Sequence, residues 1–65
     1  MNHSLTLGTA VAEIVSETRR SGGFIDVEQT AIELYLRYFD CGYSRQEIAA
    51  AIVDEAEAAR VRAVI

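Results

Sequence analysis

The segment Asp40–Ile48 constrains the fold more than any other part of the chain, because it predicts that one helix ends and another begins within a few residues. Gly42 can adopt the left-handed conformation that closes a helix at its C-terminus. Ser44 and Glu47 match the S-x-x-E capping box, in which each side chain satisfies a backbone N–H at the start of a helix. The sequence therefore predicts two helices joined by a short turn at Gly42.

The periodicity of apolar residues predicts three helices in all, over residues 6–20, 27–40 and 44–62. In the first and the third, apolar residues recur at steps of three and four, as they do on one face of a helix. Asp26 is a favourable N-cap for the second helix, with Gln29 three residues later. We therefore expect an all-α fold, a small three-helix bundle in which the second and third helices form an antiparallel hairpin.

The second predicted helix is apolar around nearly its whole circumference and keeps only a narrow polar stripe. A helix of this kind is typically buried. We therefore place it in the middle of the bundle, with the first helix packed on its other side. The predicted core takes residues from all three helices: Val11, Ile14, Val15, Ile32, Leu34, Tyr35, Leu36, Phe39, Ile48, Ile52 and Val53.

The size of the chain limits how it can be stabilised. A chain of 65 residues forms one domain, over residues 1–65, and buries only about 60% of its unfolded surface. Cys41 and His3 are the only cysteine and the only histidine, which excludes an intrachain disulfide and a zinc site with four such ligands. Helix packing and oligomerisation remain as the sources of stability for a domain of this size. The long third helix and its apolar tail Val61–Ile65 favour a homodimer.

The composition narrows the choice of partners and of compartment. The chain is 51% hydrophobic and carries a net charge of −4, so electrostatics do not favour nucleic acid or an anionic membrane as a partner. No signal-peptide pattern is present, and the longest aliphatic run, Ala49–Val53, is too short to span a bilayer. We therefore expect a cytoplasmic protein. The basic residues are all arginine, which together with the many alanines suggests a bacterial or phage gene.

Residues Gly42–Ala49 resemble the entry to the first helix of a helix-turn-helix motif. Such a motif needs a turn glycine about four residues after Ala49 and then a helix with basic or amide side chains. Val53 occupies that place, and Asp54–Glu57 continues the helix with carboxylates. The resemblance therefore implies at most a degenerate motif, with DNA contacts from Arg37, Arg45 or the pair Arg19 and Arg20.

A shorter stretch, Phe39–Ser44, is similar to the loop after the first helix of ubiquitin-associated domains, which are also built from three short helices. Cys41 stands where that family usually has methionine. The third helix of the family has no counterpart in this sequence. The likeness covers only the loop, and the sequence is therefore not assigned to this family.

Catalytic chemistry has little support in the sequence. Cys41 follows the second predicted helix, where the negative end of the helix dipole disfavours a thiolate, so we interpret it as a small residue in a turn. Paired carboxylates act as acid and base only where a pocket raises the pKa of one of them. Helices of these lengths can hardly enclose such a pocket. We expect a protein that is not an enzyme, with no cofactor, no metal and no small-molecule substrate.

The residues that could contact a partner protein lie mainly on the third helix. Its carboxylates form an acidic stretch that is either a solvated face or a docking surface for a basic partner. Aromatic residues gather near the end of the second helix, and we assign Tyr35, Tyr38 and Phe39 to the core, with Tyr43 partly exposed. The candidate partner-binding residues are Glu47, Asp54, Glu55, Glu57, Tyr43 and Arg37.

Three functions remain open at this point. The first is a non-enzymatic protein-interaction module, a small regulator, adaptor or inhibitor of the kind carried by phages and plasmids. The second is a small dimeric transcriptional regulator with the degenerate helix-turn-helix. The third is a structural or assembly subunit whose role is self-association.

Overall fold

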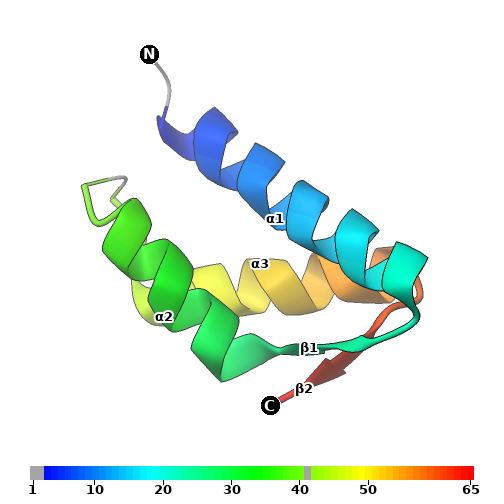
Figure 1. Ribbon diagram of the computed structural model, residues 1–65. Coiled ribbons are helices and arrows are strands. Elements are labelled where there is room, and N and C mark those ends of the chain that lie inside the picture. The colour runs from blue at the N-terminus through cyan, green and yellow to red at the C-terminus, as the bar shows by residue number, and fades with distance from the viewer. Residues whose placement is uncertain (1–2, 41) are drawn as a thin grey trace.

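The computed structural model describes residues 3–40 and 42–65, with side chains from residue 7 onward, and these residues form helices and two short strands. The elements, in order, are α1 (His3–Ser21), β1 (Phe24–Asp26), α2 (Val27–Arg37), α3 (Arg45–Ala58) and β2 (Arg62–Val64) (Figure 1). The prediction of a mostly helical fold is confirmed, and the two strands add a small sheet that the all-α prediction does not include.

The two strands run parallel, with Phe24, Ile25 and Asp26 opposite Arg62, Ala63 and Val64. Parallel strands need a long crossover connection, and here α2 and α3 together provide it. The middle residue of each strand turns inward, since Ile25 is buried and Ala63 half-buried while their neighbours are exposed. The sheet therefore closes one end of the helical layer and ties the first third of the chain to its last residues.

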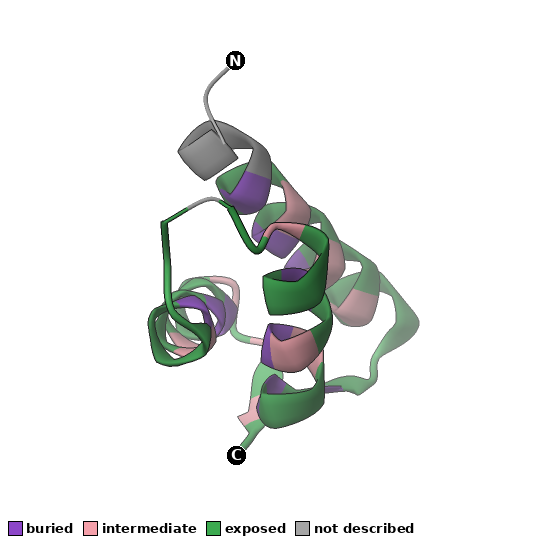
Figure 2. Ribbon diagram, turned by 90° about the vertical axis from the view of Figure 1, so that its left-hand side faces the viewer, coloured by how far each residue is buried: buried purple, intermediate pink, exposed green. Residues whose placement is uncertain are grey.

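The central element is α3, which packs against both α1 and α2. Contact between α1 and α2 is slight, so the prediction that the second helix lies in the middle is wrong. Figure 1 shows α1 and α2 side by side in front of α3. In Figure 2, α2 stands upright, whereas α3 is seen nearly end-on. Since α2 crosses α3 steeply, the two helices do not form the antiparallel hairpin that the sequence predicts.

The helix boundaries differ from the predicted ones at several ends. The first helix runs over His3–Ser21 instead of 6–20. The second stops at Arg37 instead of residue 40, because its C-cap, Tyr38, has left the helical conformation with φ −121° and ψ 39°. Gly42 adopts the positive φ that was predicted, 90°, but it lies in the connection to α3 and does not close a helix.

Helix α1 ends in a Schellman motif. Gly22 has φ 76°, and its N–H donates to the carbonyl of Arg19 at 3.3 Å. The N–H of Gly23 reaches back to the carbonyl of Thr18 at 3.2 Å. These bonds satisfy the last carbonyls of the helix and turn the chain into β1.

Helix α3 ends with the same hydrogen-bond pattern, although no glycine is present. Arg60 takes φ 59° and donates its N–H to the carbonyl of Glu57 at 3.1 Å, while the N–H of Val61 donates to the carbonyl of Ala56 at 2.8 Å. The helix predicted over 44–62 therefore stops at Ala58. The apolar tail folds back as β2 and does not overhang the domain.

The core gathers on the inner sides of α1, α2 and α3 and on β1 (Figure 2). The predicted core residues Val11, Val15, Leu34, Ile48 and Ile52 are buried. Ile14 and Val53 are half-buried and pack against this core. The core assignment is wrong for Tyr35, Leu36 and Phe39, which are exposed, and Ile32 is only half-buried. The buried residues that the prediction lacked are Leu7, Ile25, Val27, Ala31 and Ala56.

Candidate interaction surfaces

The start of α3 is built by the capping box that the sequence predicts. The Ser44 hydroxyl oxygen accepts the N–H of Glu47 at 3.1 Å, and the N–H of Ser44 donates to Oε1 of Glu47 at 2.8 Å. Glu47 therefore has a local role in starting the helix, besides its predicted role as a partner-binding residue. Ile48, the next residue, is buried, so the cap also fixes which face of α3 turns inward.

The remaining acidic candidates, Asp54, Glu55 and Glu57, are all exposed along the outer side of α3. The core side of this helix carries only apolar residues, and the carboxylates therefore point away from α1 and α2. Between Arg45 and Arg60 the chain has no basic residue. This side of α3 consequently presents only negative charge among exposed alanines.

The other two candidates lie, like Glu47, nearer the connection between α2 and α3 than the acidic residues Asp54, Glu55 and Glu57 do. Arg37 is exposed in the last turn of α2 and lines a hollow of about 380 Å³ between α1 and the end of α2, together with Tyr38 and Glu13. Tyr43, 38% exposed, lies in the connection before α3. The structure thus distributes the six predicted residues over two regions and does not bring them into one site.

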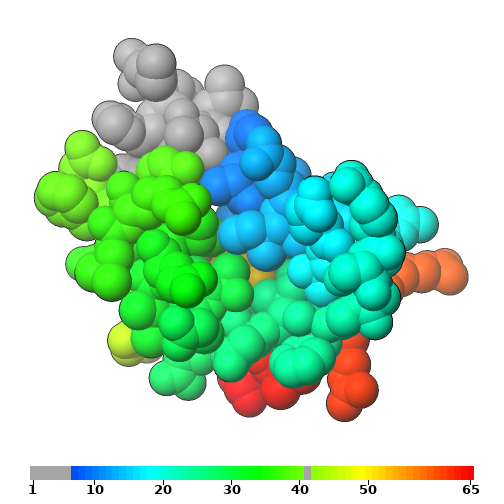
Figure 3. All heavy atoms as spheres, in the orientation of Figure 1, coloured from blue at the N-terminus to red at the C-terminus, as the bar shows by residue number. Residues whose placement is uncertain are grey.

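An exposed apolar surface on α2 was missed by sequence reasoning. We call the residues Ile32, Tyr35, Leu36 and Phe39 the outer face of α2. Leu36 and Phe39 are the most exposed of the four, at 69% and 72%, and Tyr35 is 38% exposed. In Figure 3 the side chains of α2 and of the turn after it, in green, form the left flank of the molecule.

A hollow adjoins this outer face. It has a volume of about 510 Å³ and lies between α2 and the first turn of α3. Ile32, Tyr35 and Leu36 line one side, and Ser44, Arg45 and Gln46 line the other. The outer face therefore offers both projecting apolar side chains and a recess, with polar groups along one wall of the recess.

Arginines gather at the corner where α1 and α3 end. Arg19, Arg60 and Arg62 line a common hollow of about 300 Å³ beside Gly22 and Gly23. Cations are favoured near helix C-termini, because the helix dipole is negative there. The Schellman motifs bring both C-termini to this corner. Of these arginines, only Arg19 is among the DNA contacts that the sequence predicts.

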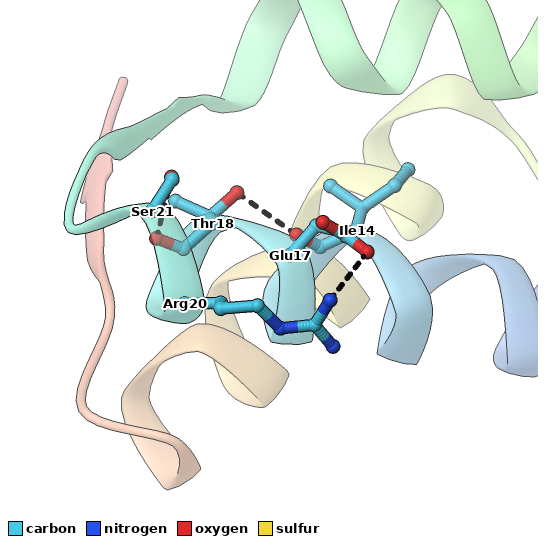
Figure 4. A network of polar contacts seen from close by, with 5 residues as sticks. All are labelled: Ile14, Glu17, Thr18, Arg20 and Ser21. Atoms are coloured by element: carbon cyan, nitrogen blue, oxygen red, sulfur yellow. Dashed lines mark hydrogen bonds and ion pairs between the residues drawn. The ribbon is translucent and has the colours of Figure 1, made fainter.

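The polar contacts near the same end of α1 are local to that helix (Figure 4). The Thr18 hydroxyl donates to the carbonyl of Ile14 at 2.8 Å, and the Ser21 hydroxyl donates to the carbonyl of Thr18 at 3.0 Å. Arg20 pairs with Glu17 at 3.2 Å, with side chains 74% and 71% exposed. An exposed pair of this kind contributes at most about 0.5 kcal/mol, so these contacts support the helix end and build no binding site.

The residues with metal-binding or nucleophilic chemistry are dispersed. Within residues 3–40 and 42–65, no group of three His, Cys, Asp or Glu side chains could hold a metal ion. Cys41, predicted to be a turn residue, lies outside the described residues. None of the helices in the described part of the chain is both long enough and apolar enough to cross a membrane.

Comparison of the chain with protein-family models, with curated proteins and with solved structures finds no match.

Proposed function

We propose that this chain is a non-enzymatic protein-interaction module, a small regulator, adaptor or inhibitor that acts by covering the surface of a partner protein. The observation that carries the proposal is the outer face of α2, where Leu36 and Phe39 are more than two-thirds exposed. Contiguous exposed apolar surface on a small protein marks an interaction site. Apolar residues spaced by three and four along a helix are the anchors with which amphipathic helices bind their targets.

The acidic side of α3 supports a protein partner over nucleic acid. Asp54, Glu55 and Glu57 present carboxylates without a compensating cation on the same side of the helix. Such a surface repels phosphates and attracts basic residues. In this proposal the outer face of α2 supplies the binding energy, and the acidic side of α3 helps to select the partner.

The test is capture of partners from a lysate of the source organism, treated with nuclease, by three forms of the tagged chain. Leu36→Glu changes the outer face of α2, and Glu55→Gln with Glu57→Gln neutralises part of the acidic side of α3. The wild-type chain should retain a stoichiometric protein, and Leu36→Glu should lose it. A protein that all three forms retain equally would contradict the assignment to the outer face of α2.

A small DNA-binding regulator is the second candidate, and the arginine corner favours it. Arg19, Arg60 and Arg62 line one hollow, which gives an acidic chain a local site of positive charge. Non-specific DNA affinity depends on such contacts and falls steeply with salt. A mobility-shift assay with random duplex DNA at low salt, on the wild type and on Arg60→Gln with Arg62→Gln, distinguishes the two functions. Binding lost in the double variant would favour DNA.

A further inference from the structure

The outer face of α2 is the second apolar side of a helix that is already packed. Val27, Ala31 and Leu34 of α2 are buried in the core, and these residues recur at steps of four and three. Tyr35 and Leu36 lie three and four residues after Ile32, on a different face of the helix, and Phe39 follows in the turn. A sequence that is apolar on both sides of a helix is suited to packing on both sides, and the side chains that the structure describes cover only one of them.

We infer that a second copy of this chain covers the outer face of α2, in a symmetric dimer; the inference rests on the proposed function, in which that face binds protein. A two-fold dimer uses the same surface on both copies, so the surface must complement itself. Here the exposed side chain of Leu36 stands at the hollow of about 510 Å³, and the exposed Phe39 follows three residues later in the chain. Each copy can place these side chains into the hollow of the other.

The distribution of charge favours dimerisation through the outer face of α2 over dimerisation through α3. The chain carries a net charge of −4, so two copies repel each other unless the contact avoids the negative side. On α2 and its surroundings the exposed charges have both signs, because Glu28, Glu33 and Asp40 are exposed and Arg45 lines the hollow beside the outer face. On the outer side of α3 the exposed charges are carboxylates only, and a second copy there would bring like charges together.

The exposed area agrees with a weak dimer. At about 200 Å² for a large side chain, the exposed fractions of Tyr35, Leu36 and Phe39 correspond to roughly 350 Å² of apolar surface. Homodimer interfaces are about 65% apolar, which scales this patch to roughly 550 Å² for each copy. The total is on the order of 1,100 Å², just above the minimum of about 1,000 Å² for a specific interface and below the range of about 1,200–2,000 Å² for stable ones. We expect a dissociation constant on the order of 100 µM.

Sedimentation equilibrium of the full chain between about 5 µM and 1 mM tests the inference, in reducing buffer so that Cys41 cannot cross-link two chains. The wild type should pass from monomer to dimer over this range. Leu36→Glu should raise the dissociation constant at least tenfold, because it introduces a charge at the centre of the contact. Ala51→Glu, which adds the same charge at an exposed position of α3, is the matched control, and it should dimerise as the wild type does.

The outcomes separate this inference from the proposed function. Phe39→Asp provides a second variant in case Leu36→Glu fails to fold, with circular dichroism as the check. A wild type that remains monomeric at 1 mM overturns the dimer. If the monomeric wild type captures a protein that Leu36→Glu loses, the proposed function stands. If it captures no such protein, both the dimer and the proposed function are overturned. A dimer that survives both variants but is lost in Phe24→Glu would place the contact at the sheet and overturn the inference.

Discussion

At the scale of the residue, Arg60 is unusual because it adopts a left-handed conformation, φ 59°, where glycine is the common choice. The conformation costs an L-residue about 1 kcal/mol or more. The charge offsets part of this cost, because Arg60 stands at the C-terminus of α3, where the helix dipole favours a cation. Glycine in its place would relieve the strain but would also lose the charge and give the unfolded chain more freedom.

We predict that Arg60→Gly changes the free energy of unfolding by no more than about 0.5 kcal/mol, since these effects nearly cancel. Arg60→Val should lower it by about 1–2 kcal/mol, because a β-branched residue resists positive φ. Arg62→Val is the control, as it removes the same charge two residues later in an exposed strand position. Urea unfolding measures all three, and equal losses in the two valine variants would show that the backbone of Arg60 is not strained.

At the scale of the element, α2 places two leucines in opposite environments. Leu34 is 2% exposed and Leu36 is 69% exposed, so the same substitution at the two positions has different consequences. Removing the buried side chain loses its transfer free energy and leaves a cavity. Removing the exposed one changes little in a monomer.

We predict that Leu34→Ala lowers the free energy of unfolding by about 2–5 kcal/mol, while Leu36→Ala changes it by less than about 0.5 kcal/mol. The measurement is thermal or urea unfolding at about 5 µM, below the range in which the proposed dimer forms. A loss of more than about 1 kcal/mol in Leu36→Ala at that concentration would mean that the outer face of α2 is packed within the monomer.

The helices could be predicted from the sequence, because their signals are local. The capping box of Ser44 and Glu47 and the N-cap of Asp26 both form as the sequence indicates. The strands could not, since three residues are too few for an alternating pattern. The end of α3 could not be predicted either, because Arg60 takes the position where glycine is usual, and the sequence therefore predicts a helix up to residue 62.

The sequence predicts burial of the outer face of α2, and this prediction is wrong because it assumes that the same chain covers that face. An apolar circumference indicates burial, but the sequence does not say whether the covering surface comes from the same chain. Among the candidate residues, Asp54, Glu55 and Glu57 are exposed on one side of α3 as expected. Whether Arg37 and Tyr43 lie near these carboxylates depends on the fold and could not be predicted from the sequence.

At the scale of the whole molecule, segments distant in the sequence share one core. The radius of gyration is 10.9 Å, close to the roughly 10.7 Å expected of a compact domain of this length. The buried cluster draws on α1, β1, α2 and α3, and Ala63 of β2 packs against it. No element has a core of its own, so the domain should unfold in one cooperative step.

Ile25 gives a test of this cooperativity, because it is 3% exposed at the centre of β1, while its neighbour Phe24 is 59% exposed. Ile25→Ala should lower the free energy of unfolding by about 2–5 kcal/mol, a large part of the roughly 3–10 kcal/mol expected for a domain of this size. Phe24→Ala, the control, should change it by less than about 0.5 kcal/mol.

The two spectroscopic signals of unfolding report on different parts of the molecule. Circular dichroism follows all the helices, whereas tyrosine fluorescence reports only on α2 and the connection after it, since the tyrosines are Tyr35, Tyr38 and Tyr43 and the chain has no tryptophan. If the sheet ties the ends into one cooperative unit, Ile25→Ala must shift both midpoints equally, although the substitution is in β1. Helical signal lost before the fluorescence changes would mean that α1 separates first, and the strands would then not be the link that makes this chain a single unit.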